Sequence, residues 1–306
     1  MLRKIFIIST LVFSAGQSAF AAQARSLPPD VMKARAAEPR FNREILSFTL
    51  PSGLGITATV MVPGPRKLEE QKLPVLLIFG GFEEAANVLD LLDPQIPAII
   101  SSFDYPFKPP RRFEFPESLA YLPRAKTAIH ETIAGIEELV TQLKKRSDVD
   151  PNRITIVGAS FGAPFALAAA ASDPEISGVV LVHGFGDIPG TATELLKRKW
   201  KPYLGFVAQP LAWMLTYGTW LYFETPSPED YMKKLLPSQH LLLISAENDT
   251  RLPQKAVSSL WDSAKKARAE HEQIVVAGDH LDPGGDKPIK EITGLITEWL
   301  KKTELR

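Results

Sequence analysis

The sequence predicts an α/β fold in which a mainly parallel sheet is covered by helices on both faces. Residues 73–79 are a continuous apolar run, which is typical of a strand buried on both faces, and a further buried strand is expected at 177–183. Helical patterns separate the predicted strands, most clearly at 123–145. This alternation indicates a parallel sheet, and 306 residues suffice for one large domain.

The predicted elements follow one another in a simple order. Residues 45–50 and 56–62 flank a turn with proline and glycine, so they are expected to pair as a hairpin. The later strands are expected, in chain order, at 73–79, 98–103, 154–157, 177–183, 241–245 and 273–277. Helices are expected at 123–145 and 164–171, and a turn at 148–153.

A Gly-x-Ser-x-Gly pattern lies where a predicted buried strand meets a predicted helix. Ser160 is its central residue, between Gly158 and Gly162. The small flanking residues allow strand and helix to pack closely around a strained serine, so the context predicts a nucleophile elbow. The Phe161 N–H would lie at the helix start, where it can stabilise an oxyanion. The alternative role for Ser160 is a helix N-cap after a glycine turn.

A serine nucleophile needs a base that takes its proton and a third group that orients the base. Asp249 follows the strand at 241–245, and His280 follows the strand at 273–277. Both are therefore expected at the carboxyl edge of the sheet, where the sites of open α/β sheets gather. The chain order Ser160, Asp249, His280 is the order found with a nucleophile elbow.

Each of these assignments has alternatives. Asp187 or Glu247 could be the acid, and Asp187, past the end of the predicted strand at 177–183, is the stronger of the two. His183 could be the base. Asp249 could be only a turn residue, and His280 only a solvated loop histidine.

The loop after the strand at 73–79 is expected to supply a second oxyanion donor. It contains Gly80 and Gly81, so the N–H of Gly81 or Phe82 could point at the developing charge. The alternative is an ordinary glycine turn.

Residues 191–234 carry no strand signal, and residues 202–223 contain no charged side chain. We interpret residues from about 187 to 238 as a helical lid inserted between two strands, with its apolar side over the mouth of the site. An additional pair of core helices is the alternative. The proline and glycine residues in this region argue against a transmembrane helix.

Composition and the N-terminus narrow the functional classes. The chain has 35 basic and 35 acidic residues, so its net charge does not favour nucleic acid as a partner. Because it has no cysteine, thiol catalysis, disulfides and thiolate metal sites are excluded.

Residues 1–21 resemble a signal peptide, with a basic start, an apolar run and small residues at Ala19 and Ala21. We expect cleavage near Ala21, a periplasmic or secreted domain at 22–306, and no stable membrane span after cleavage; a permanent anchor is the alternative.

Two segments carry a resemblance to a known superfamily. Residues 148–153, which lead into 156–162, and residues 248–253 resemble the α/β-hydrolase superfamily on its dienelactone-hydrolase and prolyl-oligopeptidase side. The resemblance implies an α/β-hydrolase fold with Ser160 as nucleophile, Asp249 as acid and His280 as base. Many relatives have His or Tyr where Phe79 stands, and because Phe79 cannot donate a hydrogen bond, the oxyanion donors here should be backbone groups.

We therefore expect an exported serine hydrolase of the carboxylesterase kind, which works through an acyl-enzyme and requires no cofactor or metal. Its expected partner is a small-molecule ester or acyl substrate with an apolar group. The alternatives are a serine peptidase that acts on short peptides and a non-catalytic α/β-hydrolase-fold binding protein.

Overall fold

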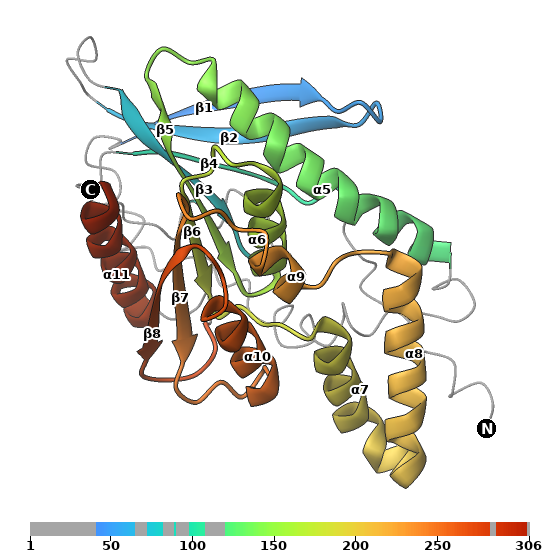
Figure 1. Cartoon of the computed structure of the whole chain (residues 1–306). Coiled ribbons are helices and arrows are strands. Elements are labelled where there is room, and N and C mark those ends of the chain that lie inside the picture. Colours follow the sequence, from blue (N-terminus) through green and yellow to red (C-terminus); the bar gives the residue numbers. More distant parts are fainter. Residues whose placement is uncertain are drawn as a thin grey trace, which may run out of the picture.

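The computed structural model describes residues 41–64, 72–81, 89, 98–107, 120–281 and 286–304. Their strands form one eight-stranded sheet in the order β1-β2-β4-β3-β5-β6-β7-β8 (Figure 1). The strands are β1 (Phe41–Thr49), β2 (Gly55–Pro63), β3 (Leu73–Phe79), β4 (Ile99–Phe103), β5 (Val149–Ala159), β6 (Gly178–Val182), β7 (His240–Ala246) and β8 (Glu270–Val276). β1 with β2 and β2 with β4 are antiparallel, and the other pairs are parallel. The predicted mainly parallel sheet is confirmed.

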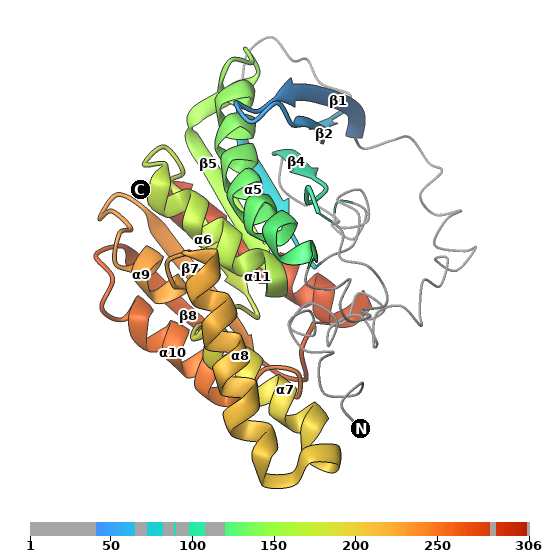
Figure 2. The same cartoon turned by 90° about the vertical axis from the view of Figure 1, so that its right-hand side faces the viewer.

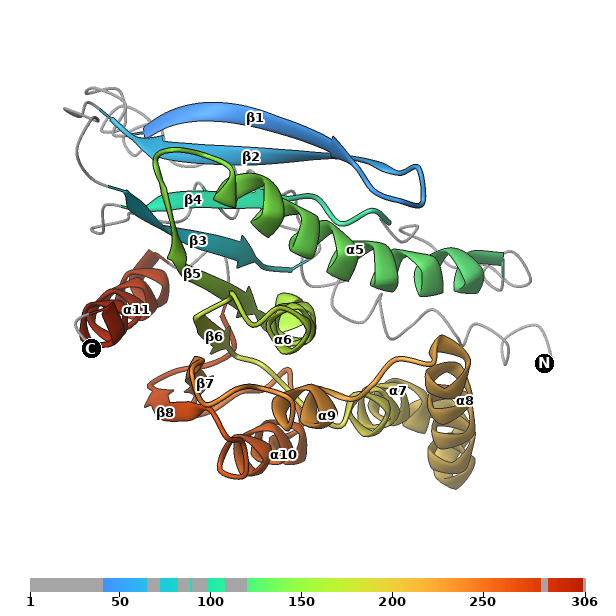
Figure 3. The same cartoon turned by 45° about the horizontal axis from the view of Figure 1, so that its top comes forward.

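Helices cover both faces of the sheet, as predicted. α11 lies on one face, and α5, α6 and α10 lie on the other (Figure 3). The helices are α5 (Tyr121–Lys144), α6 (Ala163–Ser172), α7 (Ile188–Leu204), α8 (Ala208–Phe223), α9 (Pro228–Met232), α10 (Gln254–Ala264) and α11 (Asp286–Glu304), with short 3₁₀ helices η3 (Ser160–Gly162) and η4 (Gly205–Val207).

The continuous apolar sequence of β3 follows from its central position. Successive side chains of a strand point to opposite faces of the sheet. Val75, Leu77 and Phe79 pack in the core below α5 and α6. Leu76 and Ile78 pack in the core that includes α11. Both faces of β3 are therefore covered by apolar side chains, which leaves no position for a polar residue.

The structure corrects one expected turn. Residues 148–153 were expected to turn, but β5 is already extended from Val149. The Asp150 carboxylate accepts from the Asn152 N–H and from Arg153, so these polar residues satisfy one another beside an extended main chain. Leu73 of β3 also pairs with Val149 across a register shift. This pairing extends the strand into a segment whose composition alone is typical of a turn.

Between β6 and β7 the chain forms only helices within the continuously described stretch 120–281. α7 and α8 pack against each other around a small cluster of their own, formed by Leu196, Trp200, Ala208 and Ala212. This α7–α8 hairpin extends away from the sheet (Figures 1 and 2). Among the described residues, no helix has the length and apolar content that crossing a bilayer requires. The predicted signal peptide at 1–21 lies outside the described residues.

Candidate active site

Ser160 lies on a sharp turn between β5 and α6. Its φ is +50°, a left-handed conformation that non-glycine residues seldom adopt. Glycine on either side makes this turn possible: a Cβ on Gly158 would lie 2.6 Å from the Ala166 Cβ, and a Cβ on Gly162 would overlap the Phe79 carbonyl oxygen. The close contact between β3, β5 and α6 therefore requires both glycines, and it holds the serine in a strained geometry.

The structure brings Ser160, His280 and Asp249 into one hydrogen-bonded row. His280 Nε2 lies 2.9 Å from Ser160 Oγ, and His280 Nδ1 lies 2.6 Å from Asp249 Oδ2. Asp249 Oδ1 accepts from the N–H groups of Arg251 and Leu252. Since the carboxylate accepts a hydrogen bond from Nδ1–H, the proton of the neutral ring lies on Nδ1, and Nε2 is left to accept from the serine hydroxyl. This arrangement can deprotonate Ser160 as it attacks an electrophile.

The Asp249 carboxylate is held in its charged form. Burial by itself would raise its pKa, but hydrogen bonding to His280, the attraction of the imidazole and two backbone N–H groups outweigh that effect. The pKa of Asp249 therefore lies below its ordinary value. An ionised Asp249 favours the tautomer of His280 with a proton on Nδ1 and stabilises an imidazolium.

Asp279 joins the two loops that carry the acid and the histidine, a role that the sequence analysis missed. Its Oδ1 accepts from the N–H groups of Thr250 and His280, and its Oδ2 accepts from the Thr250 hydroxyl. These hydrogen bonds lower the pKa of Asp279 to about 2. Its place immediately before His280 was the available sequence signal, but its partner Thr250 is 29 residues away.

His183 lies beside His280 and supports the loop behind it. Its Nδ1 accepts from the Leu281 N–H at 2.7 Å, and the two imidazole centroids are 5.2 Å apart. Burial, followed by the charge of His280, lowers the pKa of His183 to about 4. His183 is thus neutral at neutral pH, and its acceptor nitrogen is already used.

The loop after β3 lies against the elbow, and Tyr105 holds one of its peptide groups. The Tyr105 hydroxyl donates to the Gly80 carbonyl oxygen at 2.7 Å. The C=O and N–H of a trans peptide point in opposite directions, so the Gly81 N–H points away from Tyr105. Phe161 lies in η3, directly after Ser160. Phe82, the other predicted donor, lies outside the described residues.

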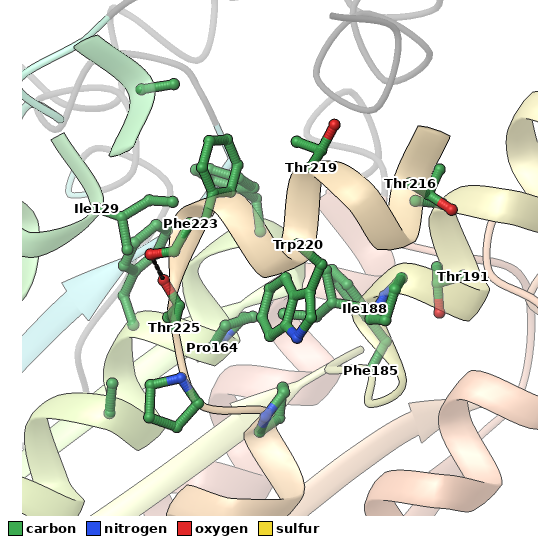
Figure 4. Close-up of a pocket in the computed structure, with 18 of the residues that line it drawn as sticks. Ile129, Pro164, Phe185, Ile188, Thr191, Thr216, Thr219, Trp220, Phe223 and Thr225 are labelled. Atoms are coloured by element: carbon green, nitrogen blue, oxygen red, sulfur yellow. Dashed lines mark hydrogen bonds between the residues drawn. The ribbon is translucent and has the colours of Figure 1, made fainter. Parts of the chain in front are cut away.

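A cavity of about 180 Å³ opens next to the elbow, between α5, α6, α7 and α8. Its lining includes Phe161, which follows Ser160 in sequence, and Leu252, which lies three residues after Asp249. Figure 4 shows Trp220, Phe223 and Ile129 around the space. None of the described lining residues is charged. The hydroxyl groups of Thr191, Thr216 and Thr225 donate to main-chain carbonyl groups, so these three lining hydroxyls already have acceptors.

The sequence profile of the prolyl oligopeptidase family matches residues 125–303, which include Ser160, Asp249 and His280. The chain belongs to this family. Comparison with curated protein sequences gives no match. Membership of the prolyl oligopeptidase family agrees with the resemblance inferred from residues 148–162 and 248–253, and it supports a serine hydrolase.

Solved structures share the fold of this family member at low sequence identity. An acylaminoacyl peptidase from Pyrococcus horikoshii is 16% identical with a TM-score of 0.60, covering 92% of this chain and 44% of its own. A prolyl endopeptidase is 17% identical with a TM-score of 0.59, covering 89% and 40%. A fungal esterase from Rhizomucor miehei is 18% identical with a TM-score of 0.58, covering 95% and 96%. The chain thus spans less than half the length of the two peptidases.

In this prolyl oligopeptidase family member, the alternative acids lie elsewhere. Asp187 is the N-cap of α7, where it accepts from the Gly190 N–H, and it lies 3.6 Å from Lys255. The Glu247 side chain is exposed. Among the described residues, the carboxylate that hydrogen-bonds to His280 Nδ1 is that of Asp249 and neither of these two.

One group of potential metal ligands coincides with this site. Ligand atoms of His183, Asp249 and His280 lie within 4.8 Å of one another. However, Asp249 and His280 already share a short hydrogen bond, and the Nδ1 of His183 accepts from Leu281. A cation bound through the facing atoms of Asp249 and His280 would have to displace that hydrogen bond, so the donor set fits proton transfer better than metal binding.

Proposed function

We propose that this chain is a serine hydrolase that cleaves carboxylic esters with an apolar group. The observation that carries the proposal is the row of hydrogen bonds from Ser160 Oγ to His280 Nε2, at 2.9 Å, and from His280 Nδ1 to Asp249, at 2.6 Å. In this proposal Ser160 is the nucleophile, His280 is the general base and acid, and Asp249 orients His280 and stabilises its charge.

The reaction follows from these positions. Ser160 Oγ attacks the ester carbonyl carbon while His280 Nε2 takes the hydroxyl proton. His280 then gives that proton to the departing alcohol oxygen, which leaves an acyl-enzyme. Water attacks the acyl carbon, His280 takes a proton from the water, and the same proton returns to Ser160 as the acid leaves. The N–H groups of Phe161 and Gly81, or of Phe82, are proposed to bind the oxyanion in both steps.

The apolar cavity supports the proposed class of substrate. A carbonyl group at Ser160 would place one side of the substrate near Phe161 and Leu252, where the cavity begins. An aliphatic or aromatic acyl or alcohol group would gain about 25 cal/mol for each Å² that it buries there. We propose that the α7–α8 hairpin is the predicted lid, since Trp220 and Phe223 of α8 line this cavity.

Hydrolysis of short peptides is the second candidate, and the family match favours it. The uncharged lining weighs against it, because a short peptide brings charged termini that bind best to oppositely charged groups. An ester and an amide with the same acyl group separate the two candidates. We expect the enzyme to accelerate hydrolysis of the ester more than hydrolysis of the amide, each compared with its own uncatalysed rate. A greater acceleration for the amide would favour the peptidase.

A fluorophosphonate probe tests the proposed nucleophile directly. We expect wild-type protein to be labelled and Ser160→Ala to be unlabelled, with ester hydrolysis reduced by about 10⁴-fold or more. Ser258→Ala is the matched control, because Ser258 is an exposed serine on α10. Labelling of Ser160→Ala would contradict the assignment, and an unlabelled wild type would favour the non-catalytic binding protein.

A further inference from the structure

We propose that the outer face of the α7–α8 hairpin binds the surface of an anionic lipid bilayer. The hairpin face is defined here by five exposed apolar or aromatic residues: Tyr203, Phe206, Trp213, Met214 and Leu221. Phe206 is 92% exposed and Tyr203 is 85% exposed, at the turn between the two helices. Large apolar side chains gathered on one exposed surface mark an interaction site more often than chance exposure.

Three of these residues lie along one side of α8. Leu221 follows Trp213 by eight residues and Met214 by seven, which corresponds to about two helical turns. Tyr203 lies in the last turn of α7, and Phe206 lies in η4 at the tip. The opposite side of α8 contacts α7 and the cavity, through Ala212, Thr216 and Phe223. A helix on a water-exposed surface normally carries charged residues on its outer side, but residues 202–223 include none.

The charges beside this face indicate what it binds. Residues 195–223 contain four basic residues and no acidic residue, although basic and acidic residues balance over the whole chain. Lys197 pairs with Glu194 on α7, whereas Arg198, Lys199 and Lys201 are exposed near the end of that helix. Lys199 is one helical turn from Tyr203, so positive charge directly adjoins the aromatic tip. Aromatic residues together with Lys and Arg are typical of elements that lie in the interface of an anionic membrane.

The dimensions of the hairpin favour an interfacial position over a spanning one. α8 has 16 residues and is about 24 Å long, and no described helix meets the length and apolar content needed to cross a bilayer. An α8 lying flat would bury the hairpin face at the boundary between headgroups and acyl chains. The inner side of the same helix lines the cavity, so binding would bring the cavity close to the lipid surface.

Sedimentation with lipid vesicles tests this proposal. We expect wild-type protein to sediment with vesicles that contain phosphatidylglycerol, and to do so less with pure phosphatidylcholine or at high salt. The double variant Phe206→Ser, Trp213→Ser should bind about tenfold more weakly or worse. Arg198→Gln and Lys201→Gln should each weaken binding to anionic vesicles about fivefold.

The matched control is Ile45→Ser, which removes an isolated exposed apolar side chain on β1 (64% exposed) and should leave vesicle binding unchanged. Lipids with brominated acyl chains should quench part of the tryptophan fluorescence of the wild type, and Trp213→Phe should lose most of that quenching. Vesicle binding does not require turnover, so its result is independent of the proposed ester hydrolysis. In Phe206→Ser, Trp213→Ser, hydrolysis of a short water-soluble ester should be unchanged, because neither residue lines the cavity.

Three results would overturn the proposal. The first is a wild type that binds neither kind of vesicle. The second is equal binding by wild type and the Phe206→Ser, Trp213→Ser variant. The third is a wild-type dimer in solution that this double variant converts to a monomer without any vesicle binding, which would identify the hairpin face as a contact between two copies of the chain.

Discussion

The position of the proton on the His183 ring determines whether this side chain can accept a hydrogen bond from the loop that carries His280. Because Nδ1 accepts from the Leu281 N–H, the neutral ring carries its proton on Nε2. If Nδ1 were protonated, its N–H would face the Leu281 N–H, and two donors cannot form a hydrogen bond. The loop that carries His280 would then lose its hydrogen bond to His183. The buried ring faces His280, Asp249 and Asp279, and burial is the main reason that it resists a second proton.

This histidine predicts a pH dependence of stability. Its pKa falls from an ordinary value of 6.5 to about 4 on folding, so between these values the unfolded chain binds more protons than the folded chain. The free energy of unfolding should therefore be greatest above pH 6.5 and fall as the pH approaches 4, by on the order of 3 kcal/mol from this group. Denaturant unfolding at several pH values measures the slope.

His183→Asn is the informative variant for that measurement. The Asn side-chain oxygen can accept from the Leu281 N–H without titrating, and Asn tolerates the positive φ of 49° at this position. We expect a smaller loss of stability between pH 6.5 and pH 4 than in wild type. Equal slopes in the two proteins would show that other groups cause the acid sensitivity.

At the scale of elements, the loops after β3 and β4 form one unit through the Tyr105 hydrogen bond. Burial raises the pKa of Tyr105 above its ordinary value, so its hydroxyl remains a donor to Gly80. The ring also packs against Phe79 of β3 and against Phe161 beside the nucleophile. The loop after β4 thereby orients the peptide group that carries the Gly81 N–H.

Removal of that one hydroxyl should impair turnover more than binding. We expect Tyr105→Phe to lower kcat about tenfold with little change in KM, because a misaligned oxyanion donor acts in the transition state. Steady-state kinetics with a soluble ester measure both constants. Tyr203→Phe, at an exposed tyrosine outside the cavity, is the control. A rise in KM with unchanged kcat would assign Tyr105 to substrate binding instead.

At the scale of the whole molecule, the cavity exists because the α7–α8 hairpin packs beside helices that cover the sheet. α5 and α6 form one part of its wall, and α7 and α8 form the other. Neither part encloses the space alone. The size of the group that fits should therefore be adjustable from the α7–α8 hairpin, without any change to the hydrogen bonds that link Ser160, His280 and Asp249.

Thr219 of α8 offers such a change, since it lines the cavity and is only partly buried. We expect Thr219→Trp to fill part of the space, lowering kcat/KM for long-chain esters about tenfold while leaving acetate esters little affected. Thr219→Val keeps the volume and is the control. Rates across a series of acyl lengths measure the effect, and an equal loss at every length would place the acyl group outside this cavity.

Local sequence patterns were sufficient for much of the fold. The apolar run of β3, the strand β2 and the helix α5 were predicted close to their observed bounds, because each depends on neighbouring residues. The pairing of β1 with β2 was also predicted, but β1 begins at Phe41, four residues before its predicted start. β5 was predicted too short, since its first residues are extended by pairing with Leu73 and not by their own composition. α10 and α11 were not predicted.

The sequence by itself determined that Ser160, Asp249 and His280 follow strands at one edge of a sheet, because strand and turn signals are local. Only the tertiary structure decided which acid meets the histidine: Asp249 lies 2.6 Å from His280, while Asp187 caps α7. It also decided the supporting contacts of Asp279 with Thr250, His183 with Leu281 and Tyr105 with Gly80. These pairs are 25 to 98 residues apart, and only the order of strands in the sheet brings them together.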